Sequence, residues 1–237
     1  MQDNLELGYH QIKGLAEPIR WLLAHLQIDY KETNPDGDAW YGGEKFNMGL
    51  DFPNLPYLID GDFKLTESVA IPEYIIKKTA NLELLGKTIE DQAKVCMIRA
   101  VARDVRVIFS KLIGLKTGHK EAIQEILEKR PFEKKCEQFG ALIGDKDFFL
   151  DYLTLADLEV AYWVYYWRSM VQSLGLDNPF THERYGRLNG LIERVSQASP
   201  GLIAYFQGQK WRDIPFHSKP YVYFDFTNFP LDLENNQ

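Results

Sequence analysis

The chain has 237 residues, of which 45% are hydrophobic and 26% charged, and its net charge at neutral pH is −7. This composition is typical of a globular protein with one large domain or two small ones. The acidic balance argues against nucleic-acid binding, which needs a basic surface. The longest apolar run, VAYWVYYW at 160–167, is too short to span a membrane.

The two cysteines, Cys96 and Cys136, are too few for a disulfide scaffold in a chain of this length. Both lie in helix-like patterns, so we expect two buried, unreactive thiols in a reducing compartment. The N-terminal segment MQDNLELGYH is acidic and lacks an apolar signal core. Together these features predict a cytoplasmic protein.

The first 80 residues alternate between strand-like and helix-like segments. Apolar residues at helical spacing, with Pro18 in the first turn, predict a helix over 14–27. A hairpin is predicted over 56–66, where Asp60 and Gly61 join two strand-like runs. The other segments are a strand at 5–9, a short strand at 29–33, a Gly- and Asp-rich loop at 34–49 and a helix at 67–79. The order β-α-β-(α)-β-β-α, with one optional helix, predicts a small mixed sheet covered by helices.

After Asn81 the pattern becomes helical. Thr154 followed by Asp157 is a capping-box pattern at the start of one helix. Helices are predicted over 88–114, over 119–144 (one or two), over 154–175 and over 184–208 (two). We therefore expect an α/β unit over 1–83, an all-helical unit over 88–220 and an aromatic tail over 221–237.

Common catalytic templates are missing from the sequence. It contains no G-x-x-x-x-G-K-[ST], no H-E-x-x-H and no G-x-S-x-G. The five histidines have no metal-ligand spacing, and the cysteines form no C-x-x-C. The sequence therefore gives no support for a metal enzyme or a serine hydrolase.

Three short segments of the N-terminal unit remain as candidates. Tyr9 ends the first strand. Pro56 opens a strand and leaves the peptide groups of Leu55 outside the ladder, where they could pair with an extended peptide. A cis bond before Pro56 would turn those groups outward. Glu67 and Ser68 lie at a helix start, where free N–H groups favour an anion and the carboxylate suits an ammonium. The last pair is therefore suited to the zwitterionic end of an amino acid.

The same segments carry a family resemblance. LGYHQIKGLAEPIR, EKFNMGLDFPNLPYLIDG and KLTESVAIPEYI resemble the N-terminal domain of cytosolic glutathione transferases, most closely the mu class. TLADLEVAYWV resembles the capping-box segment of the family's helical domain. The resemblance implies a thioredoxin-like, glutathione-binding domain followed by an all-helical domain, which is the organisation expected above.

The resemblance implies a role for each matched residue. Tyr9 matches the catalytic tyrosine, whose hydroxyl would favour the glutathione thiolate by donating a hydrogen bond to it. Leu55 matches the residue whose backbone pairs with the cysteinyl part, and Glu67 and Ser68 match the pair that binds the γ-glutamyl end. Lys45 matches a lysine that meets the glycine carboxylate. The other expected contacts are His10, Leu15, Trp40 (or Tyr41), Asn54, Pro56 and Asp104.

The resemblance also implies a homodimer. Phe52 sits where mu-like proteins have an aromatic side chain that inserts into the partner subunit, and Asp104 matches an aspartate that reaches the partner's glutathione.

Among the expected glutathione contacts, Glu67 stands where the mu class has a glutamine. The sequence departs from the mu pattern at four other places: the loop after Tyr30 is short, His10 replaces a tryptophan, Gly114 falls where mu enzymes often have a second tyrosine over the electrophile, and the tail after Pro220 is longer and aromatic. These four departures affect the class and the electrophile pocket and not the glutathione contacts.

The expected activity is transfer of the glutathione thiolate to small hydrophobic electrophiles, with glutathione as co-substrate and no metal or other cofactor. Two alternatives stay open. One is a glutathione-dependent isomerase or peroxidase on the same site, and the other is a non-catalytic, ligandin-type binding protein that sequesters hydrophobic ligands.

Overall fold

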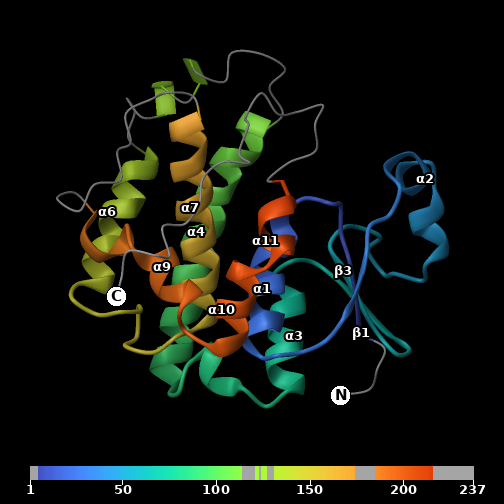
Figure 1. Ribbon diagram of the computed structural model, residues 1–237, viewed down its shortest axis with the longest axis horizontal. Helices are drawn as coiled ribbons and strands as arrows, with labels where there is room; N and C mark the ends of the chain where they lie inside the picture. The colour runs from blue at the N-terminus through green and yellow to red at the C-terminus, as the bar shows by residue number, and fades with distance from the viewer. Residues whose placement is uncertain (1–4, 114–120, 123, 127–130, 174–184, 216–237) are drawn as a thin grey trace. The chain divides into compact units, whose positions relative to one another are not determined.

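The computed structural model describes residues 5–113, 121–122, 124–126, 131–173 and 185–215 (Figure 1). The described chain divides into two compact units. One contains the described residues of Met1–Leu82 and Ser199–Ser218, and the other those of Glu83–Ala198. The expected tail at 221–237 lies outside the described residues. The N-terminal unit thus includes a segment that follows the helical unit in the sequence.

A mixed four-stranded sheet forms the centre of the N-terminal unit. Its strands are β1 (Leu5–Gly8), β2 (Lys31–Thr33), β3 (Tyr57–Asp60) and β4 (Phe63–Thr66), in the order β2-β1-β3-β4. β1 pairs with β2 in parallel, whereas β1–β3 and β3–β4 are antiparallel. The hairpin predicted at Asp60 and Gly61 is confirmed, because β3 ends at Asp60 and β4 begins at Phe63.

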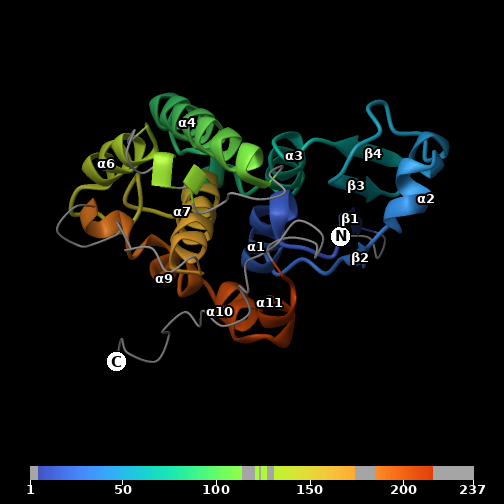
Figure 2. The same ribbon diagram turned by 90° about the horizontal axis from the view of Figure 1, so that it is seen from above.

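Helices cover both faces of this sheet. Figure 2 shows α1 (Glu17–His25) and α3 (Ala70–Lys78) on one face and α2 (Gly37–Tyr41) on the other. A 3-10 turn, η1 (Gly14–Ala16), leads into α1, another, η2 (Glu44–Asn47), follows α2, and a third, η3 (Leu82–Leu85), follows α3. The segment 34–49 was predicted as loop-rich with one optional helix before the third strand, and it contains α2 and η2. The Asp36 side chain accepts a hydrogen bond from the Ala39 N–H (3.0 Å) and so caps α2.

The helices α10 (Pro200–Gln207) and α11 (Gln209–Asp213) complete the N-terminal unit. Gly201 lies so close to α1 that an added Cβ would be 1.8 Å from the Ala24 carbonyl oxygen. Trp21 of α1 contacts Phe206 and Trp211, with ring centroids 5.0 and 5.9 Å away. This packing groups the segment with the sheet, and it differs from the contiguous helical unit over 88–220 that the sequence predicted.

The helical unit contains α4 (Ile89–Ile113), α6 (Pro131–Ile143), α7 (Leu155–Ser173), η4 (Gly186–Leu188) and α9 (Leu191–Ser196). α7 packs against both α4 and α9. The capping box at its start is confirmed, because the Asp157 carboxylate accepts from the Thr154 N–H (2.8 Å) and hydroxyl (2.6 Å). In the part of the chain that the structure describes, no helix is long and apolar enough to cross a membrane.

The prediction of two buried cysteines is half wrong. Cys136 is buried and Cys96 is exposed, and both are free thiols. Cys96 lies on α4 between the buried residues Val95 and Ile98, but its own side chain faces outward. The periodicity correctly predicted the helix but gave the wrong face for this residue.

Candidate functional site

The candidate residues of the N-terminal unit gather at one edge of the sheet. The register aligns Gly8 of β1 with Tyr57 of β3, and Tyr57 in turn with Thr66 of β4. Tyr9, Pro56 and Glu67 are the next residues along these three strands. Because β1 and β4 run one way and β3 the other, all three lie just beyond the same edge.

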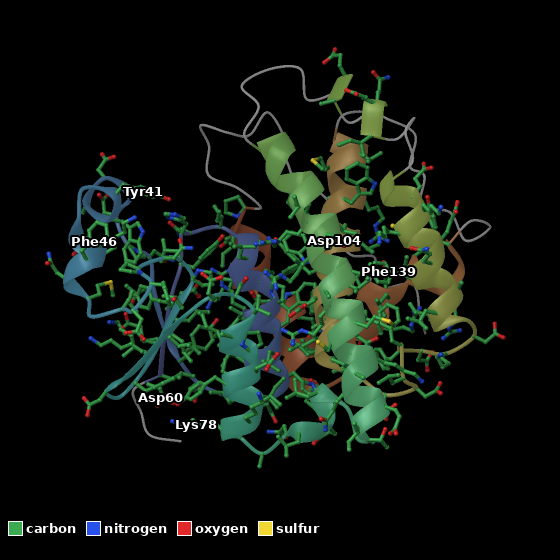
Figure 3. The ribbon with its side chains drawn as sticks, turned by 180° about the vertical axis from the view of Figure 1, so that it is seen from behind. Tyr41, Phe46, Asp60, Lys78, Asp104 and Phe139 are labelled. Carbon is green, nitrogen blue, oxygen red and sulfur yellow. The ribbon has the colours of Figure 1, made fainter. Side chains whose placement is uncertain are left out.

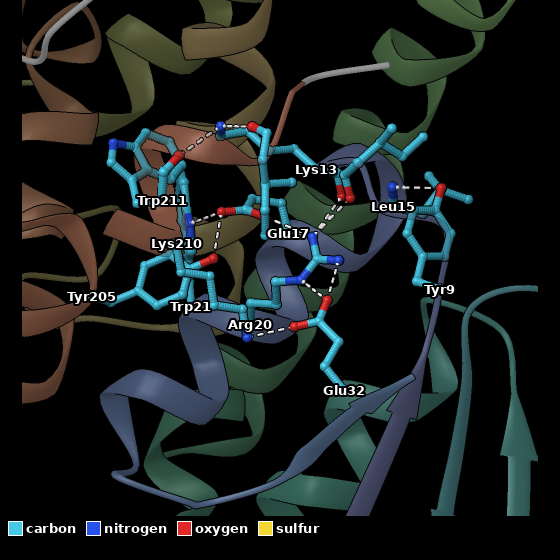
Figure 4. A network of polar contacts seen from close by, with 12 residues as sticks. Tyr9, Lys13, Leu15, Glu17, Arg20, Trp21, Glu32, Tyr205, Lys210 and Trp211 are labelled. Atoms are coloured by element: carbon cyan, nitrogen blue, oxygen red, sulfur yellow. Dashed lines mark hydrogen bonds and ion pairs between the residues drawn. The ribbon is translucent and has the colours of Figure 1, made fainter. Parts of the chain in front are cut away.

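Tyr9 is fixed at this edge by its backbone and by its phenol. Its N–H donates to the Thr33 carbonyl (3.0 Å), and its carbonyl accepts from the Asn34 side chain (2.9 Å). The phenol oxygen accepts a hydrogen bond from the Leu15 N–H at 3.0 Å (Figure 4). A hydroxyl that accepts such a bond becomes a stronger donor, because successive hydrogen bonds polarise one another. The arrangement therefore prepares Tyr9 to donate its own proton to a ligand.

Gly14 leaves the space that the Tyr9 ring needs. Its φ is +42°, and an added Cβ would lie 2.5 Å from the phenol oxygen and 2.8 Å from Cε1 of Tyr9. Both the backbone conformation and the close approach require glycine. Sequence reasoning missed this residue, although a glycine at the start of a helix is an available signal.

The segment before β3 presents an unused peptide group. The Leu55–Pro56 bond is cis, as the sequence reasoning considered. The Leu55 side chain is 8% exposed, whereas its backbone N–H and C=O make no hydrogen bond to the described residues. Asn54 beside it is exposed. This peptide group can pair with an extended backbone, in the manner of an added strand.

Glu67 and Ser68 lie between β4 and α3. Glu67 has a φ of +76° and is exposed, and its carbonyl accepts from the N–H groups of Ala70 and Ile71 (both 3.0 Å). α3 begins at Ala70, and its N-cap, Val69, makes no side-chain cap hydrogen bond. Within the described ranges neither the Glu67 carboxylate nor the Ser68 hydroxyl has a side-chain partner. Both groups are thus available to an ammonium and a carboxylate.

The structure separates the two neighbours Trp40 and Tyr41. Trp40 is 2% exposed and stacks on Tyr57 (centroids 6.0 Å apart), and no described residue accepts from its indole N–H. Tyr41 is 69% exposed and lies beside Phe46 at the α2 end of the unit (Figure 3). The Lys45 amine is 5.7 Å from the centre of the Tyr41 ring. Trp40 can therefore offer its indole N–H as a hydrogen-bond donor to a ligand, and Tyr41 can offer the exposed face of its ring.

His10 connects Tyr9 with Tyr41. Its ring centroid lies 5.7 Å from that of Tyr9 and 6.1 Å from that of Tyr41. Its Nε2 lies 3.4 Å from the Tyr41 hydroxyl oxygen. Burial lowers the pKa of His10, so the imidazole is neutral at physiological pH.

The remaining predicted residues are Leu15, Phe52 and Asp104. Leu15 is half-buried and contributes its backbone N–H to Tyr9. Phe52, in the loop before Asn54, is 75% exposed. Asp104 is an exposed residue of α4 in the other unit, and its role stays a prediction.

A buried polar network, which sequence reasoning missed, lies behind the edge (Figure 4). Arg20 of α1 pairs with Glu17 (2.9 Å) and Glu32 (2.6 Å). Glu17 also accepts from Tyr205 and from the Trp21 indole, both at 2.9 Å. Burial and the Glu17 charge raise the pKa of Tyr205 well above its usual value, so this phenol stays protonated and acts as a donor.

Comparisons with known proteins agree with this geometry. Residues 5–77 match the family model of the glutathione S-transferase N-terminal domain. The chain is 34% identical over 217 residues to the glutathione S-transferase class-mu 26 kDa isozyme 51 of Fasciola hepatica, covering 90% of this chain and 93% of that one. It is 36% identical over 175 residues to glutathione S-transferase Mu 7 of Rattus norvegicus, covering 65% and 75% of the two chains.

A solved structure supports the same assignment. The crystal structure of the glutathione S-transferase Blo t 8 superposes with a TM-score of 0.77 at 30% identity, covering 91% of this chain and 98% of that one. The four-stranded sheet with its helices is therefore the thioredoxin-like domain implied by the resemblance, and the second unit is the helical part. With this fold and these relatives, the chain belongs to the glutathione S-transferase family.

Proposed function

We propose that this protein binds glutathione at the sheet edge and transfers its thiolate to small hydrophobic electrophiles. Tyr9 donates its hydroxyl proton in a hydrogen bond to the bound sulfur and so favours the thiolate. The thiol proton leaves to solvent as the thiolate forms. The sulfur then attacks the electrophile and either displaces a leaving group, which departs with the electron pair of the broken bond, or adds to an activated double bond, whose carbanion takes a proton from water. Glutathione is the co-substrate, and no metal or other cofactor takes part.

The hydrogen bond from Leu15 to the Tyr9 phenol is the observation that carries this proposal. A free thiol has a pKa of about 8.5, so only a few per cent of it is thiolate at neutral pH. Lowering this pKa by about 2 units needs about 2.7 kcal/mol. One hydrogen bond to a charged group contributes about 1.5–3 kcal/mol. A single well-oriented phenol is therefore sufficient, and no general base is required.

The remaining contacts follow from the groups available at the edge. The Leu55 peptide pairs with the cysteinyl backbone, and the unpartnered Glu67 and Ser68 side chains hold the γ-glutamyl end. Lys45 and the Trp40 indole N–H face the glycine carboxylate. The ligand then lies across the ends of β1, β3 and β4 with its sulfur beside Tyr9.

The protein acts as a cytoplasmic homodimer in this proposal. Support comes from the family assignment and from the exposed Phe52 ring, which a second subunit would cover. Burying one phenylalanine contributes about 1.5–3 kcal/mol to association. Asp104 of each subunit then contacts the glutathione of the other.

Tyr9→Phe tests the mechanism. The variant should keep glutathione affinity within about twofold, because the contacts of Leu55, Glu67 and Ser68 are unchanged, and it should lose about 10–100-fold of the rate with an aryl halide. Ultraviolet absorbance of the thiolate should show the pKa of bound glutathione returning toward its free value. A variant whose bound thiol titrates like that of the parent would show that Tyr9 does not stabilise the thiolate. A parent that binds glutathione but has no turnover would support the carrier alternative.

A further inference from the structure

The loop that carries the Leu15 N–H has little regular structure of its own. It runs from the end of β1 to the start of α1, and its last three residues form η1. Gly14, with φ at +42°, is conformationally permissive. Leu15 itself lies in η1, but residues 10–13 before it have no regular structure, so contacts from neighbouring elements help to hold the Leu15 N–H at 3.0 Å from the Tyr9 phenol.

Arg20 holds the loop from the side of α1. Its Nη1 donates to the carbonyl oxygens of Ile12 (2.9 Å) and Lys13 (3.3 Å). The guanidinium is itself oriented by Glu17 and Glu32, at 2.9 and 2.6 Å. Two carbonyl groups of the loop are thus fixed by one rigid, fully paired side chain.

Lys13 holds the loop from the opposite direction. It is only 5% exposed, and its amine donates to the Trp211 carbonyl (2.8 Å) and to the Ile214 carbonyl. Its backbone N–H donates to the Pro215 carbonyl (2.7 Å), and the amine lies 4.5 Å from the centre of the Trp211 ring. Figure 4 shows the Lys13 side chain reaching from the loop toward Trp211. A buried lysine with three carbonyl contacts to one segment is a fixed anchor.

We propose that Lys13 is a positioning residue for the thiolate chemistry. By tying the loop to residues 211–215, it keeps the Leu15 N–H on the Tyr9 phenol and thereby strengthens the bond from Tyr9 to sulfur. This inference rests on the proposed role of Tyr9. It assigns to α11 and the residues after it a part in catalysis, although none of them touches the substrate.

The anchor does not depend on the charge of Lys13. Burial lowers the pKa of the Lys13 amine to about 8, although Glu17 and Asp213 raise it while Arg20 lowers it further. A neutral amine keeps two N–H groups, which match the two carbonyl acceptors of Trp211 and Ile214. The contact therefore persists on both sides of this pKa.

Lys13→Met tests the proposal, because the methionine side chain fills similar space but cannot donate to the Trp211 and Ile214 carbonyls, whereas the backbone N–H bond to Pro215 is kept. The pKa of bound glutathione should rise by about 0.5–1 unit, and kcat/KM at pH 6.5 should fall about 3–10-fold, since each unit is a tenfold change in thiolate below the pKa. KM for glutathione should stay within about twofold, because no contact of the tripeptide is removed. Lys13→Arg, which keeps the donors, should restore most of the thiol pKa. If Lys13→Met does not fold, the pKa of bound glutathione is measured in Lys13→Gln instead. Glutamine retains part of the donor capacity, so the pKa should rise by less than in Lys13→Met.

Lys210→Met is the matched control. Lys210 also ties α11 to the rest of the unit, through the Tyr30 hydroxyl (3.0 Å) and the Glu32 carboxylate, and reaches the loop only indirectly, because Glu32 also pairs with Arg20. It should lower the melting temperature and move the thiol pKa clearly less than Lys13→Met does. An equal thiol shift in Lys210→Met, or none in Lys13→Met, would overturn the positioning role. If the parent itself failed to lower the thiol pKa, the proposed function of Tyr9 would fail first, so the two outcomes are distinguishable.

Discussion

Replacing Gly14 by alanine should disable Tyr9 while leaving the fold in place. The added methyl group would lie 2.5 Å from the phenol oxygen and 2.8 Å from Cε1. Non-bonded carbon atoms are normally about 3.5–4.0 Å apart, so the ring must move by about 1 Å. A 1 Å misplacement of a reacting group costs about 100-fold in rate. We therefore expect Gly14→Ala to lose about 10–100-fold in kcat with an aryl halide.

The substitution also strains the backbone, and this effect needs a separate control. A residue with a side chain costs about 1–2 kcal/mol in the left-handed region, and Gly14 has a φ of +42°. Gly61, in the β3–β4 turn, has a φ of +63° and no atom within 4 Å of an added Cβ. Gly61→Ala therefore introduces similar strain without a contact to the phenol. Urea denaturation should show a comparable loss of unfolding free energy in both variants.

Two measurements decide the outcome. Steady-state kinetics should show a lower kcat in Gly14→Ala alone, with KM for glutathione within about twofold. Thiolate absorbance should show a raised pKa of bound glutathione in Gly14→Ala and an unchanged one in Gly61→Ala. If Gly14→Ala kept both the rate and the thiol pKa of the parent, the close approach of Gly14 would not control the position of Tyr9.

Two further substitutions test the buried polar groups. Burial raises the pKa of Asp157 to about 6, from about 3.9 in an unfolded chain. The protonated carboxyl thus favours the folded state below about pH 4, and this contribution is lost as the pH rises through about 6. Asp157→Asn should therefore flatten that part of the pH profile of the unfolding free energy. A profile as steep as that of the parent would contradict the raised pKa of Asp157. Arg20→Met leaves Glu17 and Glu32 without their shared partner, so urea denaturation should show a loss of about 3–5 kcal/mol. A loss below 1 kcal/mol would mean that water or Lys210 replaces the guanidinium.

Local sequence patterns predicted the elements that depend on local chemistry. The helical spacing around Pro18, the strand-like runs on either side of Gly61 and the capping box at Thr154 each correspond to an observed element. α2 was predicted only as an optional helix without bounds, because a five-residue helix is too short to show a period, and its Asp and Gly residues are also typical of loops. The exposed face of Cys96 was missed because periodicity identifies a helix more reliably than the environment of one position.

The candidate site likewise has residues that the sequence indicated and residues that it did not. The residue patterns singled out the segments of Tyr9, Leu55 and Glu67, the family resemblance implied their roles, and the strand register brings all three to one sheet edge. It did not indicate Lys13, because the acceptors of this lysine are backbone carbonyls about 200 positions away, and a backbone carbonyl has no sequence signature. The close packing of Gly201 against Ala24 was also not predicted. A contact between helices that are distant in the sequence depends on both partners, and neither residue indicates it alone.

The N-terminal unit is assembled from two stretches of chain, and this has a consequence for its synthesis. A nascent polypeptide leaves the ribosome N-terminus first, so the sheet and α1 emerge long before α10 and α11. Until then the indole of Trp21 lacks its aromatic neighbours and Glu17 lacks Tyr205. The N-terminal unit is therefore among the last parts to mature, and a fragment ending at Leu82 would lack the packing partners that α10 and α11 supply.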